Sequence, residues 1–110
     1  MKTHGLLIDF KYCTGCHACE IACKNEHDIA MDEWGIKVFE FGPQKLKGKW
    51  AWDYLPMPTD LCDLCTERRE AGKKPACVHH CLADCMAVVP VEEISARMQE
   101  AGDKVVSYIP

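Results

Sequence analysis

Nine cysteines in a chain of 110 residues constrain this sequence more than any other feature. Eight of them form two sets of four. The first set has gaps of two, two and three residues and consists of Cys13, Cys16, Cys19 and Cys23. The second has gaps of two, eleven and three residues and consists of Cys62, Cys65, Cys77 and Cys81. So many cysteines in so small a chain indicate a fold held together by disulfides or by metal.

Metal explains these cysteines better than disulfides do. The first ten residues contain one lysine and an apolar core of three residues, which is too short for the hydrophobic region of a secretory signal. We therefore expect a cytoplasmic protein, in a reducing compartment where disulfides are rare. The odd number of cysteines also leaves one of them unpaired in any scheme built only from disulfides.

The first set has the spacing of cysteines that hold 4Fe-4S clusters in bacterial ferredoxins. Two-residue gaps let one tight loop turn three thiolates toward a common centre, and Gly15 gives that loop the backbone freedom it needs. The fourth cysteine of such a run ligates the other cluster in two-cluster ferredoxins, so a second set is required. The spacing predicts cluster 1 on Cys13, Cys16, Cys19 and Cys81, and cluster 2 on Cys62, Cys65, Cys77 and Cys23.

Two alternatives stay open at this level. The second set taken alone has the spacing of a tetrahedral four-thiolate zinc site, so a zinc-binding interaction module competes with an iron-sulfur protein. Cys85 follows Cys81 after three further residues, and the spacing does not exclude Cys85 as a ligand. We favour a buried free thiol for Cys85, because free cysteine packs as a small hydrophobic residue.

Two stretches of the chain resemble the ferredoxin-like dicluster iron-sulfur proteins, and among these the electron-transfer subunits of dimethyl sulfoxide reductase-type oxidoreductases. The stretches run from Ile8 to Glu26 and from Leu61 to Cys81, and together they contain all eight spaced cysteines. Two positions depart from the family pattern. Leu82 follows Cys81 where proline is usual, and Cys85 stands where the family commonly has alanine.

This resemblance implies an α+β protein with the bacterial dicluster ferredoxin-like fold and two 4Fe-4S clusters. It also implies a small, non-catalytic electron-transfer subunit that relays single electrons to or from a larger catalytic subunit. A molybdenum or tungsten pterin enzyme is the partner that the family suggests, and a flavoprotein is the next possibility. A free-standing soluble dicluster ferredoxin is the alternative within the same class.

Between the cysteine sets, residues 36–41 and 50–55 alternate between apolar and polar side chains. This period of two predicts a β-hairpin inserted between the cluster motifs, with an exposed connection over residues 42–49. Trp50, Trp52 and Tyr54 fall on one face of the second strand. That face either shields the clusters as core or docks a larger subunit, since tryptophan and tyrosine are enriched at interface hot spots.

The segments outside the hairpin complete a single predicted ferredoxin-like domain over residues 1–110. A short apolar strand over residues 5–10 leads into the first cysteine set, and a short helix begins at Ala18. After the second set, a strand over 86–90, a helix over 91–101 and a strand over 104–109 form a C-terminal helix-strand cap.

Charge and motifs exclude several other functions. The formal net charge of -4 disfavours binding to nucleic acid, which requires a basic surface. No apolar run approaches the roughly 18 residues of a membrane-spanning helix, so we expect no direct membrane insertion. The chain contains no nucleophile elbow, glycine-rich phosphate loop or metalloprotease histidine pair, so we expect no catalytic residues.

Overall fold

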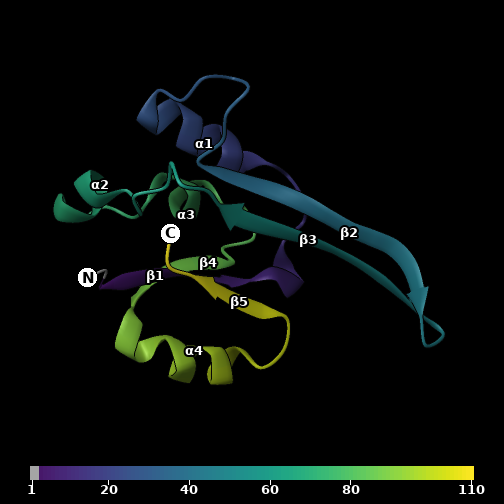
Figure 1. Cartoon of the computed structure of the whole chain (residues 1–110). Helices are drawn as coiled ribbons and strands as arrows, with labels where there is room; N and C mark the ends of the chain where they lie inside the picture. Colours follow the sequence, from purple (N-terminus) through teal and green to yellow (C-terminus); the bar gives the residue numbers. More distant parts are fainter. Residues whose placement is uncertain (1–2) are drawn as a thin grey trace.

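The computed structural model describes residues 3–110 as a mixture of short helices and small antiparallel sheets (Figure 1). The elements in chain order are β1 (His4–Asp9), the 3-10 helix η1 (Phe10–Tyr12), α1 (Ala18–His27), β2 (Ile36–Leu46), β3 (Lys49–Pro58), α2 (Thr66–Glu70), α3 (Ala76–His80), β4 (Met86–Pro90), the 3-10 helix η2 (Val91–Glu93), α4 (Ile94–Ala101) and β5 (Val105–Tyr108). The expected α+β class is confirmed, and the arrangement is compatible with a ferredoxin-like fold.

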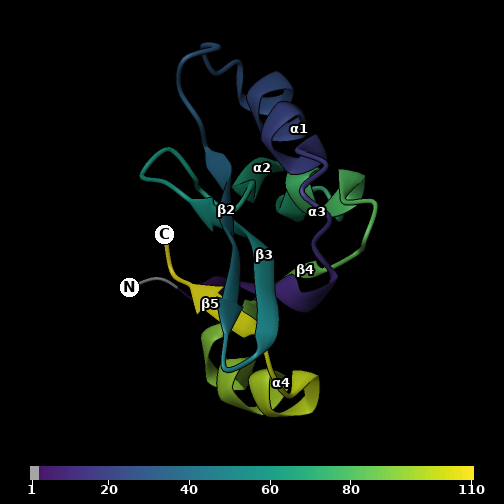
Figure 2. The ribbon, with the colours of Figure 1, turned by 90° about the vertical axis from the view of Figure 1, so that its right-hand side faces the viewer.

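A three-stranded antiparallel sheet in the order β4-β1-β5 forms the base of the molecule. Side chains alternate across the central strand β1, as in any strand. Leu6 and Ile8 are fully buried and pack with the cysteines on one face. Leu7 lines a hollow with residues of α4 on the other face. The sheet therefore separates α4 from the helices α1 and α3, which lie side by side beyond it (Figures 1 and 2).

The hairpin β2-β3 extends well beyond the sheet (Figure 1). Its base is buried through Ile36, Val38 and Pro56, whereas its outer half is exposed. The connection expected over residues 42–49 is exposed as predicted, but it is shorter than expected, because the strands continue to a two-residue turn at 47–48. A bulge between Phe41 and Gln44 takes glycine and proline out of the ladder, and pairing then resumes beyond them.

The aromatic residues of β3 differ in their exposure to solvent. Trp50 is 74% exposed and Trp52 is 55% exposed, so the interpretation of these two as core is wrong. Both belong to the outer half of the hairpin, which projects past the rest of the described chain (Figure 1). Tyr54 lies nearer the base, and its ring packs on the backbone of Gly15 in the first cysteine loop.

Cysteines form part of the hydrophobic core above the sheet. The buried residues of this core are Leu6, Ile8, Cys19, Cys23, Ile36, Val38, Leu64, Val78, Cys85 and Met86. They come from β1, α1, the hairpin base, α3 and β4, together with the loops that precede α2 and β4. The side chains that hold these elements together are therefore next to the thiols whose chemistry the sequence points to.

Candidate metal centre

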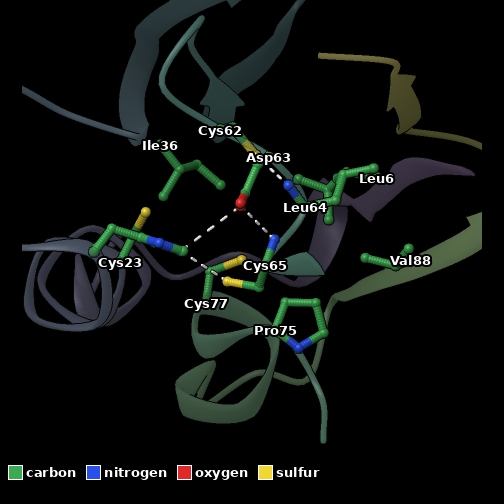
Figure 3. A pocket seen from close by; sticks show the side chains of 11 residues that line it. Leu6, Cys23, Ile36, Cys62, Asp63, Leu64, Cys65, Pro75, Cys77 and Val88 are labelled. Carbon is green, nitrogen blue, oxygen red and sulfur yellow. Dashed lines mark hydrogen bonds and ion pairs between the residues drawn. The ribbon is translucent and has the colours of Figure 1, made fainter. Parts of the chain in front are cut away.

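Four thiols from separate parts of the chain line one small cavity, which we call site 2 (Figure 3). They belong to Cys23 of α1, Cys62 and Cys65 of the loop before α2, and Cys77 of α3. Apolar side chains complete most of the wall, namely Leu6, Ile36, Leu64, Pro75 and Val88. Site 2 thus presents four sulfurs in an enclosure that limits the access of water.

Backbone amides point at the sulfurs of site 2. The amide of Leu64 lies 3.4 Å from the sulfur of Cys62. The amide of Ile36 donates to Cys23, and the amide of Ala76 donates to Cys65; each hydrogen bond lowers the pKa of its thiol. Hydrogen bonds of this kind stabilise negative charge on sulfur and are a main control of potential in iron-sulfur proteins.

Position 35 requires glycine, because its backbone lies against the sulfur of Cys23. A methyl group at this position would overlap Cys23 Sγ. The backbone at the start of β2 therefore passes directly against a thiol of site 2, and a residue without a side chain is needed for that approach.

Burial raises the pKa of the site 2 thiols Cys23, Cys65 and Cys77, which favours their protonated form when no cation is bound. Burial raises the pKa of Cys23 to about 11, and the neighbouring Cys62 and Cys65 raise it further. Burial also raises the pKa of Cys77, as do the surrounding thiols. Because the thiolate is the form that binds metal, binding here releases protons and relieves repulsion among four negative sulfurs. The donor set fits a group that takes four thiolates.

The remaining thiols of the two sets form site 1, which consists of Cys13, Cys16, Cys19 and Cys81. Burial raises the pKa of Cys13, and the charges of Cys81 and Cys16 raise it further. Burial, the charge of Glu20 and that of Cys13 raise the pKa of Cys19 to about 12. Cys16 is exposed at the loop surface. The structure places Cys81 with the first set and Cys23 with the second, and their role as ligands stays a prediction.

The loop of site 1 is shaped by Gly15 and covered by Tyr54. Gly15 has a φ of +73°, in the left-handed region that side chains disfavour. A Cβ atom at this position would lie 2.7 Å from the ring of Tyr54. The hairpin base therefore packs directly on the loop between Cys13 and Cys16.

A buried carboxylate, which the sequence analysis does not single out, joins site 1 to the hairpin. Glu20 Oε2 accepts a hydrogen bond from the amide of Val38 at 2.6 Å. Glu20 Oε1 lies 2.8 Å from Nδ1 of His17. Glu20 therefore links α1 to β2 next to the thiol of Cys19. Histidine and glutamate three residues apart within the cysteine run are a signal that could have drawn attention to it.

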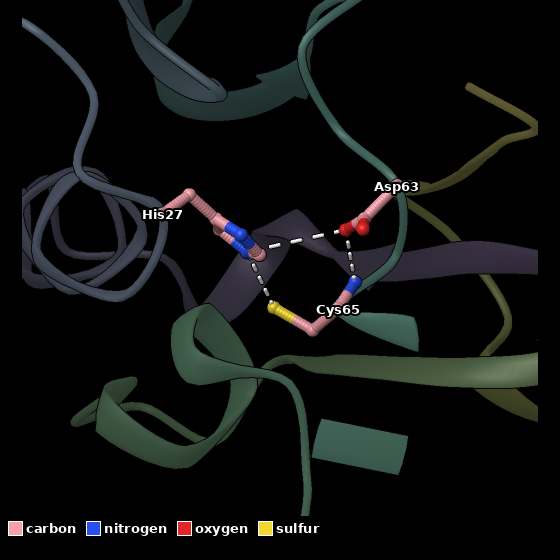
Figure 4. A group of neighbouring side chains, drawn as sticks. All are labelled: His27, Asp63 and Cys65. Atoms are coloured by element: carbon pink, nitrogen blue, oxygen red, sulfur yellow. Dashed lines mark hydrogen bonds and ion pairs between the residues drawn. The ribbon is translucent and has the colours of Figure 1, made fainter. Parts of the chain in front are cut away.

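His27 contacts a thiol of site 2, and the sequence analysis does not identify this residue either (Figure 4). Its Nε2 lies 3.1 Å from Cys65 Sγ and 3.9 Å from a carboxylate oxygen of Asp63. The same Asp63 oxygen accepts the amide hydrogen of Cys65 at 2.8 Å. These three groups lie close enough together to hold a metal ion, but Cys65 also faces the cavity with the three other thiols of site 2.

Cys85 is buried, as its interpretation as a packed thiol requires, and it also contacts site 1. Its sulfur lies 3.6 Å from that of Cys81. The thiols near site 1 therefore number five.

None of the helices formed by residues 3–110 has the length and apolar character needed to cross a bilayer.

No protein-family model matches the chain. Relatives among curated proteins do. A component of the polysulfide reductase of Wolinella succinogenes is 40% identical over 63 residues, which are 56% of this chain and 33% of that protein.

Two further relatives match over more of the chain. The putative dimethyl sulfoxide reductase iron-sulfur subunit of Halobacterium salinarum is 31% identical over 98 residues, 88% of this chain and 35% of the relative. The menaquinone reductase iron-sulfur cluster-binding subunit of Nitratidesulfovibrio vulgaris is 32% identical over 87 residues, 70% of this chain and 30% of the relative.

The chain spans about a third of the length of these curated relatives. All three are named as parts of reductases, and two are named for iron-sulfur content. The resemblance predicted from the two cysteine stretches is therefore confirmed at family level.

Proposed function

We propose that this chain is an electron-transfer unit that holds two 4Fe-4S clusters and serves a larger oxidoreductase complex. The observation that carries the proposal is site 2, where four thiols from three separate segments surround one apolar cavity. The names of the relatives support the same reading. Site 1 would hold cluster 1 through Cys13, Cys16, Cys19 and Cys81, and site 2 would hold cluster 2 through Cys62, Cys65, Cys77 and Cys23.

The bound clusters supply one-electron redox chemistry, and the residues of the chain provide the environment for it. Amides of Ile36, Leu64 and Ala76 donate to ligand sulfurs and stabilise negative charge on them. The apolar wall of site 2 excludes water, and Tyr54 covers the loop of site 1. These groups shield the sulfurs of site 2 from solvent, whereas Cys16 of site 1 lies at the surface.

Helix α1 brings the two sites close together. It carries Cys19 of site 1 and Cys23 of site 2, which are four residues apart and thus about 6 Å apart along the helix axis. The thiol of Cys77 in site 2 is close enough to Cys19 for the charge of Cys19 to raise its pKa. We infer that an electron passes directly from one site to the other.

The catalytic partner of this relay would be a larger subunit, a molybdenum or tungsten pterin enzyme or a flavoprotein. The reductase names of the relatives support such a complex. The outer hairpin supports it as well, because Phe41, Trp50 and Trp52 are exposed there and large aromatic side chains are typical anchors of protein interfaces.

An anaerobic reductive titration followed by visible absorption tests the electron-transfer function. Because each cluster takes up a single electron, the protein is expected to accept about two electrons per chain and to bleach as it does so. A protein that takes up no electrons under these conditions would contradict the proposal.

A further inference from the structure

The ninth cysteine, Cys85, lies beside site 1, which needs only four thiolates to hold a cluster. Cys85 is 6% exposed, and its sulfur lies 3.6 Å from that of Cys81. Its thiol also hydrogen-bonds that of Cys13, and Cys19 belongs to the same buried cluster. A buried thiol surrounded by three of the four sulfurs of site 1 is more than a packed side chain, because each of those neighbours is a predicted ligand.

Cys81 and Cys85 reach site 1 from different supports. Cys81 ends the short helix α3 and is followed by Leu82, which is 82% exposed. Cys85 immediately precedes β4, and its carbonyl accepts the amide hydrogen of Asp9 at 2.8 Å. The sheet therefore anchors Cys85, whereas Cys81 stands at the end of a short helix beside a surface loop. We therefore expect loss of the Cys81 sulfur to leave the position of Cys85 unchanged.

We propose that Cys85 is a reserve ligand of cluster 1, which binds in place of Cys81 when the sulfur of Cys81 is absent. This proposal rests on the proposed function. In the exchange, Cys85 gives its proton to solvent, and its sulfur forms the bond to iron that Cys81 would have made. No electron is transferred and no other reactant is needed. A rotation about the Cα–Cβ bond is the movement that carries the Cys85 sulfur toward the vacant position.

The test compares Cys81→Ala, Cys85→Ala and the double variant after anaerobic purification, by iron and sulfide content and by EPR of the reduced protein. Cys81→Ala is expected to keep about eight iron per chain with an altered EPR signal, and Cys85→Ala to keep about eight with the unaltered signal. The double variant is expected to fall to about seven iron if a three-iron cluster remains at site 1, or about four if that cluster is lost. Equal iron content and EPR signals in Cys81→Ala and the double variant would overturn the proposal.

Two controls keep the result specific. Cys77→Ala removes a predicted ligand of site 2. Among the described residues, Cys85 lies beside site 1 and not beside site 2, so this variant is expected to lose about half of the iron. Cys81→Ser, with and without Cys85, repeats the comparison with a smaller change in volume. If Cys81→Ala and Cys81→Ser both lose cluster 1 with Cys85 present, the proposal is wrong. Absence of iron from the unmodified protein would instead contradict the proposed function.

Discussion

At the scale of single residues, the imidazole of His27 is in position to donate a hydrogen bond to the sulfur of Cys65, a predicted ligand. Its Nε2 lies 3.1 Å from Cys65 Sγ, and the carboxylate of Asp63 at 3.9 Å favours the tautomer that carries hydrogen on this nitrogen. A donor at a ligand sulfur stabilises the more negative, reduced state of a cluster and raises its potential.

Replacing His27 by alanine is therefore expected to lower the potential of cluster 2. A net hydrogen-bond contribution of about 1 kcal/mol corresponds to roughly 40 mV for one electron. Potentiometric titration monitored by EPR measures the shift. His80→Ala is the matched control, since that ring is exposed and packs against His79. An unchanged potential in His27→Ala would show that His27 does not act on the ligand sulfur.

At the scale of elements, the base of the hairpin is tied to α1 and its outer half is not. Glu20 holds the amide of Val38, and Tyr54 packs on the loop of site 1. Farther out, Asp53 and Lys104 form an ion pair at 3.1 Å between β3 and the turn before β5. The two halves of the hairpin therefore have different roles. One positions site 1, and the other presents aromatic side chains.

Glu20 variants test the anchoring of the hairpin. Glu20→Ala leaves the buried amide of Val38 without its acceptor and is expected to cost about 1–3 kcal/mol in the free energy of unfolding. Glu20→Gln keeps a carbonyl acceptor and is expected to cost less. Denaturant unfolding of the loaded protein gives both values, and equal losses in the two variants would mean that the hydrogen bond to β2 is not what Glu20 contributes.

Variants of Trp50 and Trp52 test the docking role of the outer hairpin. Because both side chains are exposed, the Trp50→Ala and Trp52→Ala substitutions are each expected to change stability by less than about 0.5 kcal/mol. If these side chains are a binding hot spot, the loss of about 2 kcal/mol of binding free energy would weaken association with the partner roughly 30-fold. Size-exclusion chromatography of the tagged chain from its native cells reports the assembly, with Met31→Ala as a control at another exposed apolar residue. An assembly that persists unchanged in the double tryptophan variant would contradict this role.

At the scale of the whole molecule, the thiols of each site come from distant segments of the chain. Site 2 joins Cys23 of α1 to the loop and helix that carry residues 62–77, and site 1 joins residues 13–19 to Cys81. A domain of this size buries a limited apolar core. Thiols of α1 and α3 face the same cavity at site 2, so we expect the packing of these two helices to depend on what the thiols bind.

Removal of the metal is therefore expected to unfold much of the chain. Binding free energy at structural metal sites is folding free energy, and its loss exceeds the usual stability of a small domain. Circular dichroism before and after anaerobic chelation measures the effect. A metal-free chain with the same cooperative thermal transition as the loaded protein would contradict this expectation.

The features that the sequence predicts well are those set by local spacing. The grouping of Cys81 with Cys13 and of Cys23 with Cys62 follows from the gaps, and alternation marks strands at 36–41 and 50–55. The contacts of Glu20 with Val38 and of His27 with Cys65 were not predictable, because they depend on how α1 packs against β2 and the loop before α2. Helices α2 and α3 have five residues each, too few to show a helical period.

The measurement that tests the central claim most directly is the iron, zinc and acid-labile sulfide content of anaerobically purified protein, taken with its visible absorption spectrum. Two 4Fe-4S clusters predict about eight iron and about eight sulfide per chain and a brown colour. About one or two zinc ions with no sulfide, in a colourless protein, would contradict the account and make the chain a structural metal-binding module.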